Sequence, residues 1–169
     1  MKKLQLIYQQ KKNEIHSRLE SFKKLSENEK YKEFLFCLLT PQSSAQKCWQ
    51  AVEEISSLQE KSLENVTEIL KKKTRFHNTK AKRVLEAEKN WNEVKNELGN
   101  KKVVELRNWL AENVNGYGLK EASHFLRNVG LSRNQIAILD RHILRNLHKF
   151  GLIDEQKVKT QKNYLEIEK

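Results

Sequence analysis

The stretch Asn113–Gly130, with the sequence NVNGYGLKEASHFLRNVG, contains three of the five glycines of this 169-residue chain. Glycine costs a helix about 1 kcal/mol relative to alanine, but it tolerates a positive φ and lets another molecule approach the bare backbone. After Gly118, apolar residues at i, i+3, i+7 and i+10 predict a helix with one apolar face: Leu119, Ala122, Leu126 and Val129. The stretch therefore predicts two helices joined by a tight glycine hairpin.

A helix that begins near Gly118 presents unpaired N–H groups and the positive end of its dipole. Phosphate binds at such a place, and residues without side chains let a nucleic-acid backbone come within hydrogen-bonding distance, whatever its base sequence. We therefore expect Asn115, Gly116 and Gly118 to contact a DNA backbone. The alternative is a short corner between helices that needed two glycines only to turn.

The rest of the chain is a succession of amphipathic helical patterns, over residues 4–25, 26–39, 45–55, 63–70, 81–98 and 103–114. Ser26-x-x-Glu29 fits a capping box that starts a helix, and the only proline, Pro41, ends that helix. We expect Gly99 to close a later helix as its C-terminal cap. No segment shows a sustained period of two, so the sequence predicts an all-α protein.

The charge of the chain points to a polyanionic partner. Its 33 Lys and Arg residues exceed its 22 Asp and Glu residues, for a formal net charge of +11. The alternative is that this excess serves solubility or non-specific adhesion. No stretch of about 20 apolar residues predicts a membrane helix, and the N-terminus lacks the apolar core and cleavage site of a signal peptide, so we expect a cytoplasmic protein with no membrane partner.

Cysteine usage argues against a metal centre. Cys37 and Cys48 are the only cysteines, and both lie in apolar helical patterns away from any Cys or His cluster. We expect reduced thiols in the core. Neither a zinc site nor an iron–sulfur cluster would find enough ligands, so we expect no metal and no cofactor.

Four motifs carry a family resemblance. VNGYGLKEASHFLRNVG followed by AILDRHILRNL resembles the hairpin and trailing aspartate of the helix-hairpin-helix DNA glycosylase superfamily. Upstream, FCLLTPQSSAQKCWQAV and RFHNTKAKRVLEA resemble the type 2 8-oxoguanine DNA glycosylases, which are also AP lyases. The resemblance covers roughly residues 31–151 and rests on the occurrence of all these motifs in one order.

The resemblance implies an enzyme of base excision repair that binds damaged double-stranded DNA. Such an enzyme excises 8-oxoguanine and cleaves the strand at the abasic site by β-elimination through a lysine Schiff base. We expect two helical lobes with a cleft between them, in a monomer that is associated with the nucleoid if the organism is a prokaryote. Residues 31–115 would form the central lobe, residues 116–169 the hairpin, the catalytic helices and part of the second lobe, and residues 1–30 a helix packed with that C-terminal lobe.

The resemblance makes Lys120 the nucleophile, because it follows the second hairpin glycine by two residues. It lies off the apolar stripe of its helix and so points outward. An amine must be neutral to attack a sugar carbon, and an unperturbed lysine of pKa about 10.4 is neutral in only about one copy in 2,500 at pH 7. We therefore expect a desolvated site with positive neighbours, which lower the pKa of the amine.

The resemblance makes Asp140 the catalytic aspartate. A helix that continued through it would place its carboxylate in an apolar stripe with Ile136, Ile143 and Leu147, which is unfavourable without a partner. We expect instead that Asp140 caps a helix starting at Arg141. Its function would be a negative charge near the sugar that stabilises oxocarbenium character as the glycosidic bond breaks; the alternative is a cap and no more. His124 and His142 could assist this step, but single histidines on charged helices are more often surface residues.

A base inside a duplex must be everted before Lys120 can reach its sugar, and this leaves a gap. The resemblance suggests Arg75 as the partner of the estranged base and Phe76 as the residue that fills the gap. The alternative is that Phe76 caps a helix and Arg75 belongs to the solvated run KKKTR. Gln42, in TPQSS, is a further candidate for the minor groove or the everted base.

The sequence stops at YLEIEK with its apolar pattern unfinished, whereas the resemblance implies further helix that closes the base pocket. We therefore expect a shortened chain whose wall around the base is incomplete, and lesion specificity stays open. Three hypotheses remain: an 8-oxoguanine glycosylase and AP lyase, a relative that acts on another oxidised base, and a helix-hairpin-helix module that only binds DNA.

Overall fold

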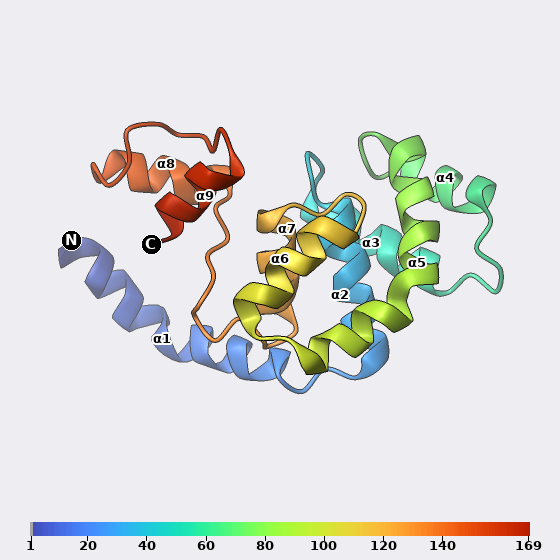
Figure 1. Cartoon of the computed structure of the whole chain (residues 1–169), viewed down its shortest axis with the longest axis horizontal. Helices are drawn as coiled ribbons and strands as arrows, with labels where there is room; N and C mark the ends of the chain where they lie inside the picture. Colours follow the sequence, from blue (N-terminus) through green and yellow to red (C-terminus); the bar gives the residue numbers. More distant parts are fainter. Residues whose placement is uncertain (1) are drawn as a thin grey trace.

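The computed structural model describes residues 2–169, and every regular element in that range is an α-helix (Figure 1). The all-α prediction is confirmed. None of the helices in this range is long and apolar enough to cross a membrane. The helices are α1 (Lys2–Phe22), α2 (Glu27–Leu39), α3 (Ala45–Ser56), α4 (Leu63–Lys71), α5 (His77–Asn100), α6 (Val103–Asn113), α7 (Leu119–Asn128), α8 (Arg141–Lys149) and α9 (Gln161–Glu168).

Local capping explains where several helices begin and end. The predicted capping box of α2 is confirmed, since the Glu29 carboxylate accepts the Ser26 N–H at 2.7 Å and the Ser26 hydroxyl accepts the Glu29 N–H. The helix ends at Leu39, before Pro41. The predicted cap at Gly99 is wrong, because α5 runs one residue further and Lys101 N–H still donates to a carbonyl four residues back.

The main hydrophobic core is built around α2, which packs against α3, α5 and α7. Phe34 lies at its centre, with the rings of Trp91, Tyr117 and Phe125 at centroid distances of 5.2–5.4 Å. The Tyr117 hydroxyl donates to the Phe34 carbonyl at 2.9 Å, so its polar atom is satisfied inside the core. Cys37 and Cys48 are both buried and free, as predicted for core thiols.

A second, smaller core holds α8 and α9, which lie on the far side of α6 and α7 from α5 (Figure 1). Its buried residues are Leu119, Leu139, Leu144 and Tyr164. Helix α7 joins the two cores, since Leu119 packs into the smaller and Phe125 into the larger. The predicted division at residues 30 and 115 stays a prediction.

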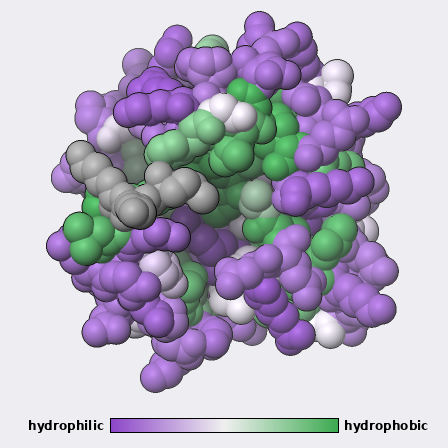
Figure 2. Space-filling view, turned by 90° about the vertical axis from the view of Figure 1, so that its left-hand side faces the viewer, coloured by the Kyte–Doolittle hydropathy of each residue, from purple (hydrophilic) through white to green (hydrophobic). Residues whose placement is uncertain are grey.

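Helix α1 packs against α7, and Phe22 at its C-terminal end is buried. Close contact there requires the left-handed Gly130, because a Cβ at that residue would lie 2.9 Å from the Lys23 backbone. The apolar residues nearer the N-terminus are instead 40–62% exposed: Leu4, Leu6, Ile7, Tyr8 and Ile15. On the face that carries α1, α8 and α9, apolar side chains gather in the middle and hydrophilic ones surround them (Figure 2).

Candidate active site

The structure explains the presence of glycine differently at the two hairpin positions, 116 and 118. Gly116 has φ +96°, a conformation that favours glycine, and a Cβ there would lie 2.7 Å from the Arg83 side chain, which would have to move. Gly118 has an extended backbone that any residue adopts, and a Cβ would meet only the flexible end of Glu121 at 3.4 Å. The need to turn therefore explains Gly116 but not Gly118. Asn115 is exposed, and its amide donates to Glu86 at 3.0 Å.

Helix α7 begins at Leu119 and places Lys120 on the side opposite its buried face, as the sequence predicts. The Lys120 ammonium pairs with the Glu121 carboxylate at 2.7 Å and keeps 31% of its side-chain surface exposed. The other oxygen of that carboxylate accepts the Gly118 N–H at 3.3 Å. Glu121 thus holds the amine of Lys120 close to the start of the helix.

Asp140 is the N-cap of α8, as predicted. One of its carboxylate oxygens accepts the N–H groups of His142 and Ile143, both at 2.8 Å. These bonds hold the carboxylate at the positive end of a helix, where a negative charge is stabilised.

Helix α9 holds the segment that leads into Asp140. The Tyr164 hydroxyl donates to the Ala137 carbonyl at 2.6 Å and accepts the Leu139 N–H at 3.3 Å. Glu168 accepts the Ala137 N–H at 2.7 Å and forms an ion pair with Arg107, which is fully buried. The position of Asp140 therefore depends on α6 and α9 as well as on its own helix.

A cleft of about 1130 Å³ brings four of the eight predicted site residues together. Its wall includes Lys120, Asp140, Gln42 and Arg75. Lys120 comes from the hairpin helix α7, Asp140 from the start of α8, Gln42 from the loop between α2 and α3, and Arg75 from the turn between α4 and α5. In Figure 1 the α2–α3 loop lies between α8 and the α4–α5 turn.

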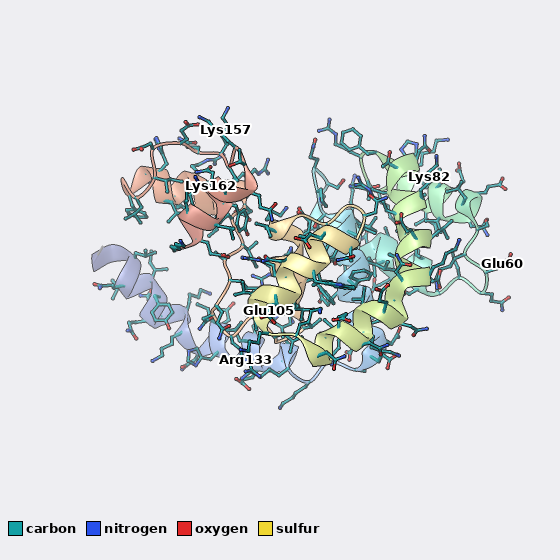
Figure 3. All side chains as sticks on the ribbon, viewed as in Figure 1. Glu60, Lys82, Glu105, Arg133, Lys157 and Lys162 are labelled. Carbon is teal, nitrogen blue, oxygen red and sulfur yellow. The ribbon has the colours of Figure 1, made fainter. Side chains whose placement is uncertain are left out.

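The cleft is strongly positive. Eight Lys and Arg side chains line it, and Asp140 is the only carboxylate among its described lining residues. The cations are Lys47, Lys71, Lys72, Lys73, Arg75, Lys120, Arg127 and Arg141. Further out, Lys82, Lys157 and Lys162 lie on the upper side of the molecule in Figure 3. A concave site of one sign concentrates ligands of the opposite charge, here a polyanion.

His124 and Arg127 also line the cleft, and they follow Lys120 on the same face of α7. Burial, together with the positive charges of Arg127 and Lys120, lowers the pKa of His124 to about 4, so its imidazole is neutral at pH 7. His124 is half-buried: its ring forms a T-shaped pair with Phe36 from α2, and it also faces the cleft. His142 is exposed, as expected. His124 and Arg127 follow Lys120 by four and seven residues, which places all three on one helix face, and this spacing could have identified them as cleft residues from the sequence.

Two residues of the cleft rim have a left-handed backbone, Gln42 with φ 55° and Phe76 with φ 57°. Such strain is uncommon outside glycine and clusters at functional sites. The Phe76 ring is 55% exposed, and the Arg75 guanidinium lies over it at 5.4 Å from its centroid. Among the described residues, Phe76 and the three hairpin residues predicted to contact DNA do not line the cleft itself.

No group of three or more His, Cys, Asp or Glu side chains in residues 2–169 is arranged to hold a metal ion. The cleft itself contains an amine at Lys120, a capped carboxylate at Asp140, a neutral imidazole at His124, and cations that can neutralise phosphates.

Comparisons with known proteins agree with this geometry. Residues 15–169 match the family model described as 8-oxoguanine DNA glycosylase. The 8-oxoguanine DNA glycosylase/AP lyase of Fusobacterium nucleatum is 41% identical over 98% of this chain and 82% of its own, and that of Methanocaldococcus jannaschii is 39% identical over 88% and 72%.

Solved structures agree as well. The crystal structure of the Methanocaldococcus jannaschii 8-oxoguanine DNA glycosylase aligns with a TM-score of 0.87 at 35% identity, over 99% of this chain and 80% of that one. The complex of the Methanocaldococcus jannaschii glycosylase/lyase with a 15mer DNA containing 8-oxoguanine aligns with a TM-score of 0.85 over 99% and 85%. The chain belongs to the 8-oxoguanine DNA glycosylase family.

Proposed function

We propose that this protein excises 8-oxoguanine from duplex DNA and then cleaves the strand at the abasic site by β-elimination. The observation that carries the proposal is one positive cleft that contains an outward-pointing lysine at the hairpin helix and a capped aspartate. The names of the relatives, 8-oxoguanine DNA glycosylase/AP lyase, support the choice of reaction and lesion.

In the proposed reaction the neutral amine of Lys120 attacks C1′ of the damaged nucleotide. The base leaves with the electron pair of the glycosidic bond and takes up a proton. The sugar ring opens to a Schiff base with Lys120, loss of a C2′ proton expels the 3′ phosphate, and water later releases the lysine. Asp140 stabilises positive charge on the sugar as the glycosidic bond breaks, since its carboxylate is already oriented by α8.

The everted base needs a compartment next to the sugar. A hollow of about 770 Å³ adjoins the cleft and shares Phe36, His124 and Arg127 with it. Trp49 also lines this hollow, and it packs edge-to-face against Phe36 at a centroid distance of 5.5 Å, so the two rings form one aromatic wall against which a purine could lie. We assign the base to this hollow, Arg75 to the estranged base, Phe76 to the gap, and Gln42 to the minor groove.

We propose that the enzyme acts as a monomer, and this is supported by the position of both proposed catalytic residues in one chain. Its place is with the DNA it repairs, in the cytoplasm or at the nucleoid of a prokaryote.

Borohydride trapping on a panel of duplexes tests the proposed function. The panel holds 8-oxoguanine opposite cytosine, an oxidised pyrimidine, a pre-formed abasic site and undamaged DNA. We expect covalent adducts with 8-oxoguanine and with the abasic site. An adduct with the oxidised pyrimidine in place of 8-oxoguanine would indicate a different lesion, and binding to every duplex without any adduct would indicate a DNA-binding module.

The hairpin predicts a second result. Gly118→Leu is expected to weaken binding to all duplexes about tenfold, because a side chain there keeps a phosphate from the positive start of α7, and a hydrogen bond to a charged group contributes about 1.5–3 kcal/mol. The Gly118 N–H itself already donates to Glu121, so the phosphate would bind the N–H groups of the following residues. Gly99→Leu is the matched control, since a Cβ at Gly99 meets open space and one at Gly118 meets only an ordinary contact with Glu121 at 3.4 Å. Fluorescence anisotropy measures both affinities. Equal affinity in the two variants would mean that the hairpin is only a corner.

A further inference from the structure

Lys80, one turn into α5, has a buried ammonium group. Only 2% of the residue is exposed, and its Nζ donates to the Leu39 carbonyl at 2.7 Å, the Pro41 carbonyl at 2.9 Å and the Ser43 hydroxyl at 2.9 Å. These partners use all three donors of the ammonium, and all of them are neutral oxygens. A buried charge without a carboxylate persists only where its hydrogen bonds are complete.

The Ser43 hydroxyl extends this connection to a third segment. It accepts the Arg75 N–H at 3.0 Å as well as the Lys80 ammonium. Lys80 and Ser43 therefore join two segments: the end of α2 with its adjoining loop 40–44, and the turn before α5, which lies more than 30 residues further along the chain. We call this set of hydrogen bonds the Lys80 node.

Each of the two segments joined by the node carries a left-handed residue at the cleft rim, Gln42 in the loop and Phe76 in the turn. A left-handed backbone in such residues is stable only where the surroundings determine it. The node supplies that constraint, because it holds the carbonyl before Gln42 and the amide before Phe76 at one point.

We propose that Lys80 and Ser43 are positioning residues that set the spacing between Gln42 and Arg75, so that both loops engage the DNA around an everted nucleotide together. This inference rests on the proposed function and deepens it. Neither residue touches the reacting atoms. The node acts on the duplex, and the chemistry at Lys120 is independent of it.

Ser43→Ala tests the node, because it removes the hydroxyl that links the loop to the turn and leaves both carbonyl bonds of Lys80 in place. We expect kcat/KM on 8-oxoguanine opposite cytosine to fall about tenfold, which corresponds to the loss of one hydrogen bond to a charged group. Trapping on a single-stranded abasic oligonucleotide should stay at the wild-type level, since that substrate needs no eversion and has no gap.

Two variants complete the test. Ser43→Thr keeps a hydroxyl and is expected to restore activity on the duplex. Ser62→Ala is the matched control, since Ser62 also accepts a backbone N–H, at 3.1 Å, at the other end of α4. The fluorescence of 2-aminopurine beside the lesion reports unstacking directly and should decrease only in Ser43→Ala.

Equal losses on the duplex and on the single strand would reduce the node to a structural role and overturn the inference. Wild-type activity of Ser43→Ala on the duplex would overturn it as well. Failure of the proposed function is distinguishable, because the wild-type protein would then form no adduct with 8-oxoguanine.

Discussion

Lys120→Gln is expected to abolish both base release and the borohydride-trapped adduct while it leaves binding to lesion DNA largely intact. The amide cannot act as the nucleophile or form a Schiff base, so the loss should be complete to the limit of detection. Binding should persist because seven other Lys and Arg side chains line the same cleft. A gel assay for released and trapped products, with anisotropy for affinity, measures both effects.

Lys72→Gln is the control for this result, because Lys72 lines the same cleft and receives the same substitution. This variant should bind DNA slightly more weakly than the wild type, and the slope of log affinity against log salt should become shallower by about 0.9, the contribution of one phosphate contact. It should still form the trapped adduct. If Lys120→Gln formed the adduct at the wild-type level, the nucleophile would lie elsewhere.

Asp140→Asn is expected to slow base release by about 100-fold or more, since it removes the charge that stabilises the sugar in the transition state. Asparagine is a good N-cap, so α8 should keep its start. A pre-formed abasic site has an aldehyde and no glycosidic bond to break, and the variant should therefore still form the adduct with it. Base release and trapping are measured separately on the two substrates.

The matched control for Asp140→Asn is Asp154→Asn. Asp154 is an exposed aspartate that, like Asp140, lies C-terminal to the hairpin helix α7 in the sequence. It should leave both rates unchanged. An equal loss on 8-oxoguanine and on abasic DNA in Asp140→Asn would contradict the separate roles assigned to the two residues, and point to a general disturbance of the cleft.

The features of the fold that sequence reasoning predicts well are local. The capping box at Ser26, the cap at Asp140 and the outward direction of Lys120 each depend on residues within one or two turns. The family motifs add the order in which the site residues occur. Together these observations placed Gln42, Arg75, Lys120 and Asp140 as candidates, and one cleft contains all four.

The features that sequence reasoning missed depend on distant contacts. Lys80 lies in a charged run that is typical of a solvated helix face. Its ammonium is buried only because α5 packs against the end of α2, where the Leu39 carbonyl accepts its hydrogen bond. His124 is half-buried because Phe36 from another helix packs against it. The Arg83 side chain packs against Gly116, yet Arg83 lies 33 residues away along the chain. Periodicity also could not show that Tyr8 on α1 is exposed.

The most direct test of the central claim is to locate the covalent adduct on the chain. The wild-type protein is reduced with borohydride in the presence of the 8-oxoguanine duplex, digested with nuclease and protease, and analysed by mass spectrometry. Lys47, Lys71, Lys72 and Lys73 line the same cleft, so the measurement discriminates among neighbouring amines. We predict that the sugar remnant is on Lys120. A remnant on any of the other four lysines would contradict the assignment of the nucleophile and the mechanism built on it.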